Sequence, residues 1–418
     1  MQVINREIYL NKLIERREND LIKIITGIRR CGKSYLLDPI FKNYLLDSGV
    51  AEDHIIKLEL DSIENEEYTD PNKLYKYVMD KVKDDSMYYI LLDEIQKVDK
   101  FESVLNSFLR KSNLDVYVTG SNSKFLSSDI VTEFRGRGDE IKVFPLSYSE
   151  FIKAYEGEEK DAFNEYMTYG GMPYVVTRKT EEQKSTYLNN LFKNTYLNDI
   201  IERNGIQKND KLDAIINMLA SSIGSLTNPN KLENTFKSNN ITDISAPTIN
   251  TYLNYLIDAF LINKAERFDI RGKKYISTPS KYYFSDVGLR NARLNFRQQE
   301  ETHIMENIIY NELLIRGYNV DVGVVEINEE DSSGKKIRKQ IEVDFVCNQG
   351  SKRYYIQSAF SIPDKEKMMQ EQRPFNFIQD SFKKIIVVRD NIKLWRNEEG
   401  TVIMGIEEFL LNKDSLDL

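Results

Sequence analysis

Short apolar runs alternate with stretches of helical spacing over the first 145 residues. The runs are rich in Ile, Leu, Val and Tyr, which favour strands, and they predict strands at 21–26, 55–60, 88–93, 116–120 and 140–144. Between them, apolar residues at helical spacing predict helices at 35–46, 71–83 and 101–111. Strands that alternate with helices are typical of a parallel α/β fold, so we expect a doubly wound parallel sheet.

The pattern becomes mainly helical from about residue 146 to residue 260. The last of these helices, 246–260, follows Ser245 as its N-cap and leads into two short strands at 263–269 and 274–284. Helices that lead into a β-hairpin predict a winged helix.

A third region begins near residue 291. It has helical spacing at 302–316, a closing helix, and expected strands near 320–327, 340–348, 353–359 and 384–389. We therefore expect three domains, which span residues 1–175, 176–290 and 291–418.

Composition narrows the class of protein. Lys and Arg number 58 against 66 Asp and Glu, a net charge of -8, which excludes bulk affinity for nucleic acid or anionic membrane. Two Cys and two His exclude a disulfide framework and a Cys/His zinc site. The N-terminus lacks a secretory apolar core, and no run approaches the ~18 apolar residues that span a bilayer. We expect a cytoplasmic protein with no membrane partner.

A complete phosphate-binding motif follows the first expected strand. The residues are Gly27, Ile28, Arg29, Arg30, Cys31, Gly32, Lys33 and Ser34, and they match G-x-x-x-x-G-K-[ST] at every fixed position. Glycines let backbone N–H groups surround phosphate oxygens, and the helix that begins near Lys33 adds its positive end. We expect ATP to bind residues 27 to 35, the last being Tyr35. Lys33 should reach the β- and γ-phosphates, and the Ser34 hydroxyl should ligate Mg²⁺.

Two acids end the third expected strand, in the run Tyr89-Ile-Leu-Leu-Asp93-Glu94. Ligands of open α/β sheets bind at the carboxyl ends of strands. Asp93 is therefore placed to hold Mg²⁺ through water, and Glu94 to orient and deprotonate the attacking water. Acids after a strand are often only loop residues, so it is the preceding lysine loop that makes this pair significant.

Small polar residues end the next strand, at 118–123. Asn122 among them is a candidate to contact the γ-phosphate or the water, and the alternative is a simple helix N-cap. Arg135 and Arg137 flank a glycine before the last strand. They are either solvated loop residues or candidates to stabilise transition-state charge across a subunit interface, which implies a homo-oligomer.

Several motifs together carry a family resemblance. They are the lysine loop, Leu-Leu-Asp-Glu-Ile-Gln, Val-Thr-Gly-Ser-Asn-Ser, Arg-Gly-Arg, Phe-Pro-Leu-Ser-Tyr-Ser-Glu-Phe at 144–151 and Tyr-Gly-Gly-Met-Pro at 169–173. The chain resembles a prokaryotic AAA-type ATPase family with a C-terminal domain of unknown function. The resemblance implies a P-loop ATPase core, a winged-helix middle and an α+β end of the restriction-endonuclease-like PD-(D/E)xK fold. The family loop usually ends in threonine, and Ser34 keeps its hydroxyl.

The C-terminal region lacks part of a nuclease site. A PD-(D/E)xK nuclease needs an acid on a helix, an aspartate on a strand and an acid-x-lysine pair on the next strand. Glu306 and Asp344 fit the first two positions, but Gln357 and Ala359 stand where the acid and the lysine belong. We therefore expect a non-catalytic structural or binding domain and no nuclease activity.

Clustered basic residues are few. They are Arg267, Arg271, Lys273 and Lys274 on the expected wing, and Lys335, Lys336, Arg338 and Lys339 in a second hairpin. Each group of four basic residues is either a solvated turn or a weak, salt-sensitive contact with phosphate groups. We expect a Mg²⁺-dependent ATPase that couples nucleotide state to its C-terminal domains. The alternative is an ATP-gated DNA- or protein-binding switch with little turnover.

Overall fold

The computed structural model describes residues 4–120, 136–207, 209–241, 243–297, 300–330 and 336–418. The backbone forms two compact units. Unit 1 is Met1–Pro145 with Asp258–Phe260, and unit 2 is Leu146–Ile257 with Leu261–Leu418.

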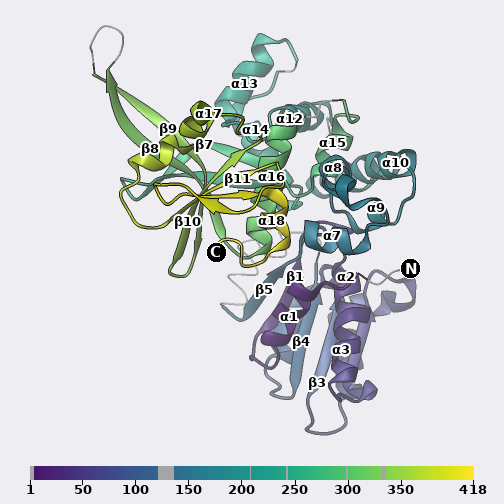
Figure 1. Ribbon diagram of the computed structural model, residues 1–418. Helices are drawn as coiled ribbons and strands as arrows, with labels where there is room; N and C mark the ends of the chain where they lie inside the picture. Colours follow the sequence, from purple (N-terminus) through teal and green to yellow (C-terminus); the bar gives the residue numbers. More distant parts are fainter. Residues whose placement is uncertain (1–3, 121–135, 208, 242, 298–299, 331–335) are drawn as a thin grey trace. The chain divides into compact units, whose positions relative to one another are not determined.

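Unit 1 contains a five-stranded parallel sheet (Figure 1). Its strands are β1 (Ile22–Thr26), β2 (Ile55–Glu59), β3 (Tyr88–Asp93), β4 (Leu114–Thr119) and β5 (Gly138–Lys142). Their order across the sheet is β2-β3-β4-β1-β5. All five strands expected from the apolar runs are confirmed, and β1, β3 and β4 are neighbours at the centre.

Helices of unit 1 pack against this sheet. They are α1 (Glu7–Glu15), α2 (Lys33–Tyr35), the π-helix η1 (Leu36–Phe41), α3 (Lys42–Asp47), α4 (Pro71–Lys81) and α5 (Phe101–Phe108), with short 3₁₀ turns at Glu52–His54, Ile63–Thr69 and Ile95–Lys97. The single helix expected at 35–46 is wrong, because the backbone of Asp38 is extended (φ -144°, ψ 121°). Proline disfavours helical conformation in the residue before it, and Pro39 follows Asp38.

Unit 2 begins with a helical region and carries further helices to the end of the chain. They are α7 (Tyr148–Ala154), α8 (Glu159–Tyr169), α9 (Pro173–Val176), α10 (Glu181–Leu191), η6 (Phe192–Leu197), α11 (Asn198–Asn204), α12 (Asn209–Ser221), α13 (Pro229–Ser238), α14 (Ala246–Asp258), α15 (Val287–Arg293), α16 (Glu301–Ile315), α17 (Lys365–Gln372), η7 (Arg373–Phe377) and α18 (Ile406–Leu411). Within the described ranges, no helix has the length and apolar character needed to cross a membrane.

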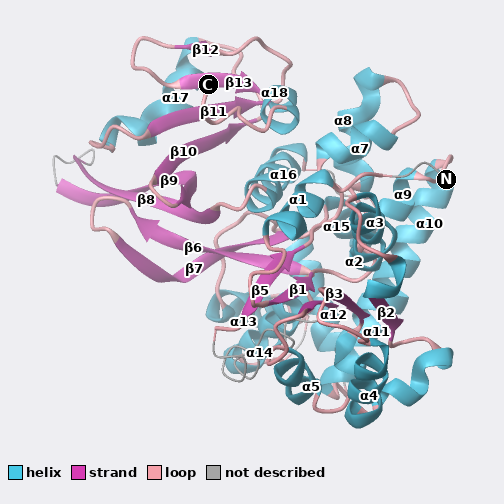
Figure 2. Cartoon of the chain, turned by 90° about the horizontal axis from the view of Figure 1, so that it is seen from below, coloured by secondary structure: helices cyan, strands magenta, loops and turns pink. Residues whose placement is uncertain are grey.

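A mixed eight-stranded sheet forms the second layer of unit 2, drawn in magenta in Figure 2. Its strands are β6 (Ile262–Asp269), β7 (Lys274–Phe284), β8 (Asn319–Glu330), β9 (Lys336–Gln349), β10 (Lys352–Ala359), β11 (Lys383–Val388), β12 (Trp395–Arg396) and β13 (Val402–Gly405). Their order is β12-β13-β11-β10-β9-β8-β6-β7. The expected strands are confirmed, whereas the pattern missed β12 and β13.

The β6–β7 hairpin, expected as the wing of a separate middle domain, lies at one edge of this sheet. Strand β6 pairs in parallel with β8, with Phe268 opposite Gly323. The expected domain boundary at residue 290 therefore falls between strands of one continuous sheet.

Candidate nucleotide-binding site

The carboxyl ends of β1, β3 and β4 meet at one edge of the unit 1 sheet. Ile25 of β1 is opposite Thr119 of β4, and Leu92 of β3 is opposite Val118. This register brings the loop that follows Thr26 close to Asp93 and Thr119. Ligands of open parallel sheets bind at this edge.

The loop from Gly27 to Ser34 needs its glycines. Gly27 has φ +139°, and a Cβ there would lie 2.0 Å from the carbonyl oxygen of Val143. Gly32 has φ +99°, in the region that favours glycine. Cys31 is buried, and its Sγ lies 3.5 Å from the same carbonyl oxygen. The loop is thus packed tightly against the strand edge.

Arg6 braces this loop, a role that the sequence pattern missed. Its guanidinium is buried and donates from Nη1 to the carbonyl oxygen of Cys31 at 2.9 Å. It also donates from Nη2 to the carbonyl oxygen of Phe144 at 2.6 Å. No motif marks an arginine so far from the loop in sequence.

Lys33 is 4% exposed, and its ammonium lies over the loop. Nζ donates to the carbonyl oxygens of Gly27 at 3.0 Å and of Ile28 at 3.2 Å. Neutral carbonyls are weaker partners for an ammonium group than phosphate oxygens. The side chain is therefore held at the loop by contacts that a phosphate can replace.

Other residues of the expected nucleotide-binding segment differ in exposure. Arg29 is half-buried, and Arg30 is exposed with a left-handed backbone (φ +61°). Ser34 is exposed, and Tyr35 is 40% exposed. Their side chains are accessible at the loop surface.

Ser34 and Asp93, the two expected Mg²⁺ ligands, are brought together. Burial raises the pKa of Asp93, and hydrogen bonds from the hydroxyls of Thr119 and Ser34 oppose this rise. Carboxylate and hydroxyl oxygens side by side are ligands that suit Mg²⁺. The residues present therefore fit the expected metal ion.

Thr119 connects the two acids, which the sequence analysis did not foresee. Its hydroxyl donates to Asp93 Oδ1 and accepts the backbone N–H of Glu94 at 2.9 Å. Glu94 has a left-handed backbone (φ 54°), unusual for a residue other than glycine. Gln96 Nε2 donates to Glu94 Oε2, so both backbone and carboxylate of this acid are held.

Three candidates remain, and the structure describes only one of them, Arg137. Asn122 and Arg135 lie outside the described residues. Arg137 is exposed beside the first residue of β1, where its carbonyl oxygen accepts the N–H of Ile22 at 2.9 Å. The length of β1, about 13 Å at ~3.3 Å per residue, separates this end from the lysine loop. The structure therefore does not bring Arg137 to the site of its own chain.

The four nuclease-position residues are close together in unit 2. Gln357 Oε1 accepts the backbone N–H of Asp344 at 2.7 Å, and Asp344 Oδ2 accepts that of Ser358 at 2.8 Å. Ala359 is buried on the same strand, β10. Burial, and after it the charge of Glu306 of α16, raises the pKa of Asp344.

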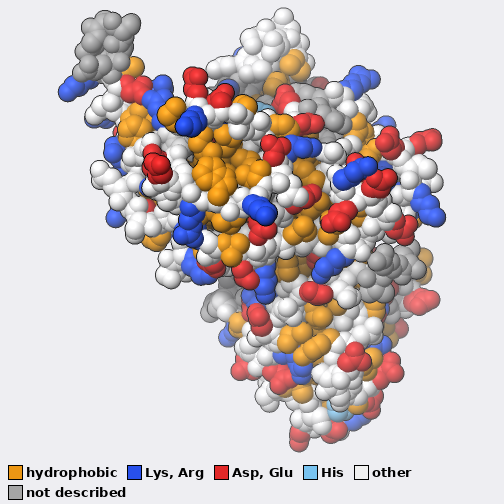
Figure 3. All heavy atoms as spheres, viewed as in Figure 1, with side chains coloured by type: hydrophobic (Ala, Val, Ile, Leu, Met, Phe, Trp, Pro, Cys, Tyr) orange, Lys and Arg blue, Asp and Glu red, His pale blue; other side chains and the backbone are white. Residues whose placement is uncertain are grey.

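The basic residues of unit 2 are partly engaged. Arg267 donates to Gln340 Oε1 at 2.6 Å, and Arg271 donates to the carbonyl oxygen of Glu326 at 3.0 Å. Lys273 and Lys274 are exposed at the hairpin tip. On the face drawn in Figure 3, blue and red side chains are interspersed.

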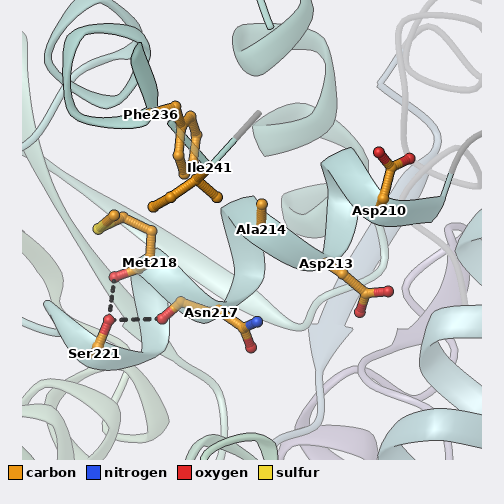
Figure 4. Close-up of a pocket in the computed structure, with 8 residues that line it drawn as sticks. All are labelled: Asp210, Asp213, Ala214, Asn217, Met218, Ser221, Phe236 and Ile241. Carbon is orange, nitrogen blue, oxygen red and sulfur yellow. Dashed lines mark hydrogen bonds between the residues drawn. The ribbon is translucent and has the colours of Figure 1, made fainter. Parts of the chain in front are cut away.

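A separate open cavity of about 530 Å³ lies between α12 and α13 (Figure 4). It is lined by Asp210, Asp213, Ala214, Asn217, Met218, Ser221, Phe236 and Ile241. Asp213 forms an ion pair with Arg293 at 2.5 Å. None of the residues expected to bind nucleotide lines this cavity.

Comparison with known proteins identifies one domain of the chain and two similar proteins. Residues 19–152 match an AAA domain, and residues 160–300 match a domain of unknown function (DUF8612). An uncharacterized protein of Haemophilus influenzae is 36% identical over 411 residues, which cover 97% of this chain and 96% of that protein. An uncharacterized protein of Methanocaldococcus jannaschii is 29% identical over 416 residues, with 96% and 86% covered.

Solved structures give a weaker likeness. The Aeropyrum pernix ORC1 protein in complex with DNA has a TM-score of 0.32 at 11% identity, with 70% of this chain and 92% of that chain covered. Cdc6p of Pyrobaculum aerophilum has a TM-score of 0.30 at 10% identity, with 73% and 97% covered. Nothing about activity follows from such low scores. The chain therefore contains an AAA domain at residues 19–152, and it belongs to the same family as the Haemophilus influenzae protein, to which it is similar over nearly its whole length.

Proposed function

We propose that this chain binds ATP with Mg²⁺ at the 27–34 loop, hydrolyses it, and couples the nucleotide state to residues 146–418. One observation carries the proposal. The register of β1, β4 and β3 brings the phosphate-binding loop beside the acid pair, which supports a single site made of both motifs. Two motifs far apart in sequence thereby support each other.

The residues divide the work between binding and chemistry. The Lys33 ammonium exchanges its loop carbonyls for β- and γ-phosphate oxygens, which are stronger acceptors because they are charged. Mg²⁺, held by Ser34 and Asp93, would neutralise charge on the phosphate oxygens. Glu94 orients a water molecule and accepts its proton as the water attacks the γ-phosphate. Thr119 and Gln96 hold Glu94 in position for this step.

Two substitutions test the proposal with separate readouts. Lys33→Ala should abolish both ATP binding and phosphate release, whereas Glu94→Gln should retain binding and lose turnover. Lys73→Ala is a matched control, because this lysine of unit 1 is exposed on α4 and pairs only with Glu67 among the described ion pairs. Unchanged turnover in both site variants would refute the assignment.

A second candidate is an ATP-gated DNA-binding switch. Helices α12, α13 and α14 precede the β6–β7 hairpin, and Thr227 forms an isolated antiparallel bridge with Ser280. Three helices ahead of a hairpin, with Thr227 bridged to the second strand of that hairpin, support a winged helix. The hairpin tip presents Lys273 and Lys274.

Duplex retention distinguishes this switch from a plain ATPase. We expect the wild-type protein to bind a DNA duplex in the presence of ATP. The variant in which Arg271, Lys273 and Lys274 are all changed to alanine should not bind it. Changing the exposed residues Lys160, Lys365 and Lys413 together is the charge-matched control. Equal retention by both triple variants would refute a DNA contact at the hairpin.

A further inference from the structure

A lysine lies at the centre of the acidic cluster in unit 2. Lys281 of β7 is 4% exposed, and its Nζ lies 2.8 Å from Glu306 Oε1 and 2.6 Å from Glu342 Oε1. Glu306 comes from α16 and Glu342 from β9. One ammonium therefore connects three elements that are far apart in sequence.

The Oε1 atom of Glu306 accepts hydrogen bonds from two side chains, Lys281 and Tyr283. Tyr283 donates its hydroxyl to the same Oε1 atom at 2.6 Å, and His303 Nδ1 lies 3.7 Å from Oε2. The loop after α12 also covers the group, because a Cβ on Gly224 would lie 3.3 Å from both carboxylate oxygens. The carboxylate is enclosed by protein groups and directly paired with Lys281.

Asp344 is also buried near this cluster, and its pKa shifts in the opposite direction to that of Glu306. Burial and the nearby charge of Glu306 raise the pKa of Asp344 to about 8. Burial alone would raise the pKa of Glu306 as well, but the Lys281 ammonium and its hydrogen bonds lower it to about 2. The two carboxyl groups therefore do not act as a symmetric pair of charged ligands.

We propose that the Lys281 ammonium is the resident cation of this cluster and occupies the position that a divalent metal ion would need between Glu306, Glu342 and Asp344. A metal bound by carboxylates requires free oxygens directed at one point, and the Oε1 atoms of both glutamates are directed at Nζ instead. The amide oxygen of Gln357 already accepts a hydrogen bond from the backbone N–H of Asp344. Among the described residues, no group of three or more His, Cys, Asp or Glu side chains is arranged to hold a metal ion.

Lys281 and the three acids around it all belong to unit 2, so their charge balance does not depend on ATP hydrolysis in unit 1. The Lys281 ammonium explains how the cluster is neutralised without an added ion. Lys281 also links the β6–β7 hairpin to α16 through Glu306 and to β9 through Glu342, so side chains as well as backbone hydrogen bonds attach the hairpin to the sheet.

Mn²⁺ titration of the full chain without nucleotide, followed by electron paramagnetic resonance of free Mn²⁺, tests the proposal. We expect Asp344→Asn to bind the same amount of Mn²⁺ as wild type. Lys281→Met should gain one Mn²⁺ site, and the Lys281→Met, Glu306→Gln double variant should lose it again. Occupation of the new site at ~100 times its Kd should raise the midpoint of thermal unfolding of Lys281→Met by ~5 °C.

The comparison of wild type with Asp344→Asn decides the question even if Lys281→Met does not fold. Asparagine has nearly the shape of the protonated aspartate, so this variant should remain folded. Mn²⁺ binding by wild type that disappears in Asp344→Asn but persists in Asp93→Asn would overturn the proposal. Failure of a folded Lys281→Met variant to gain a site would overturn it too.

Discussion

Replacing Thr119 by valine removes one hydroxyl from the nucleotide site and almost no volume. The side chain is fully buried, and its hydroxyl is bonded to Asp93 on one side and to the N–H of Glu94 on the other. A hydrogen bond to a charged group contributes ~1.5–3 kcal/mol. The left-handed backbone of Glu94 costs a further ~1–3 kcal/mol that this contact helps to offset.

The expected consequence is a lower kcat at nearly unchanged ATP affinity. If ~1.4–3 kcal/mol of this positioning is lost from the transition state, kcat falls by ~10–100-fold, since each ~1.4 kcal/mol is a tenfold change in rate. Phosphate release at saturating ATP measures kcat, and a fluorescent ATP analogue measures binding. Thr119→Ser keeps the hydroxyl and should restore most of the rate.

A merely structural role would give a different pattern. A folded Thr119→Val protein with kcat within twofold of wild type would refute the reasoning. So would a serine variant as slow as the valine variant, because then the methyl group and not the hydroxyl would matter.

Two further perturbations test other parts of the molecule. If Arg137 acts on a neighbouring subunit, ATP turnover per subunit should rise with protein concentration and Arg137→Ala should abolish the rise; a total rate strictly proportional to wild-type concentration would contradict this. Burial raises the pKa of Asp286 to about 6 from 3.8, so the folded state binds the proton more tightly than the unfolded chain. Stability should therefore fall as pH rises from about 4 to 6, by on the order of 3 kcal/mol relative to Asp286→Asn, which chemical denaturation at each pH measures; parallel pH profiles for the two proteins would argue against it.

The local pattern of the sequence was sufficient for the unit 1 sheet and for most of the nucleotide site. The run 88–93 is buried along its whole length, which is typical of a strand in a parallel sheet, and the spacing of Gly27, Gly32 and Lys33 reflects a local loop. The apolar spacing at 35–46 predicts one helix, but Pro39 disfavours helical backbone at Asp38. The effect of the proline on the backbone of the residue before it is stronger than the apolar spacing at this position.

Contacts that depend on strand register could not be predicted in this way. Thr119 meets Asp93 because β4 lies beside β3, and nothing near either residue specifies that pairing. The sequence analysis considered a lysine beside Glu306 and Asp344 only at the nuclease position, two residues after Gln357 on the same strand. Lys281 instead comes from a hairpin earlier in the chain, and only the order of strands in the eight-stranded sheet brings it to Glu306.

The pairing of β6 with β8 also determines whether the chain can be divided at residue 290. Strand β6 is hydrogen-bonded to β7 on one side and to β8 on the other. A chain cut at residue 290 would leave β6 with an open edge, and open edges pair with other chains and aggregate. The strands before and after residue 290 therefore depend on each other, and a protein cut there should aggregate.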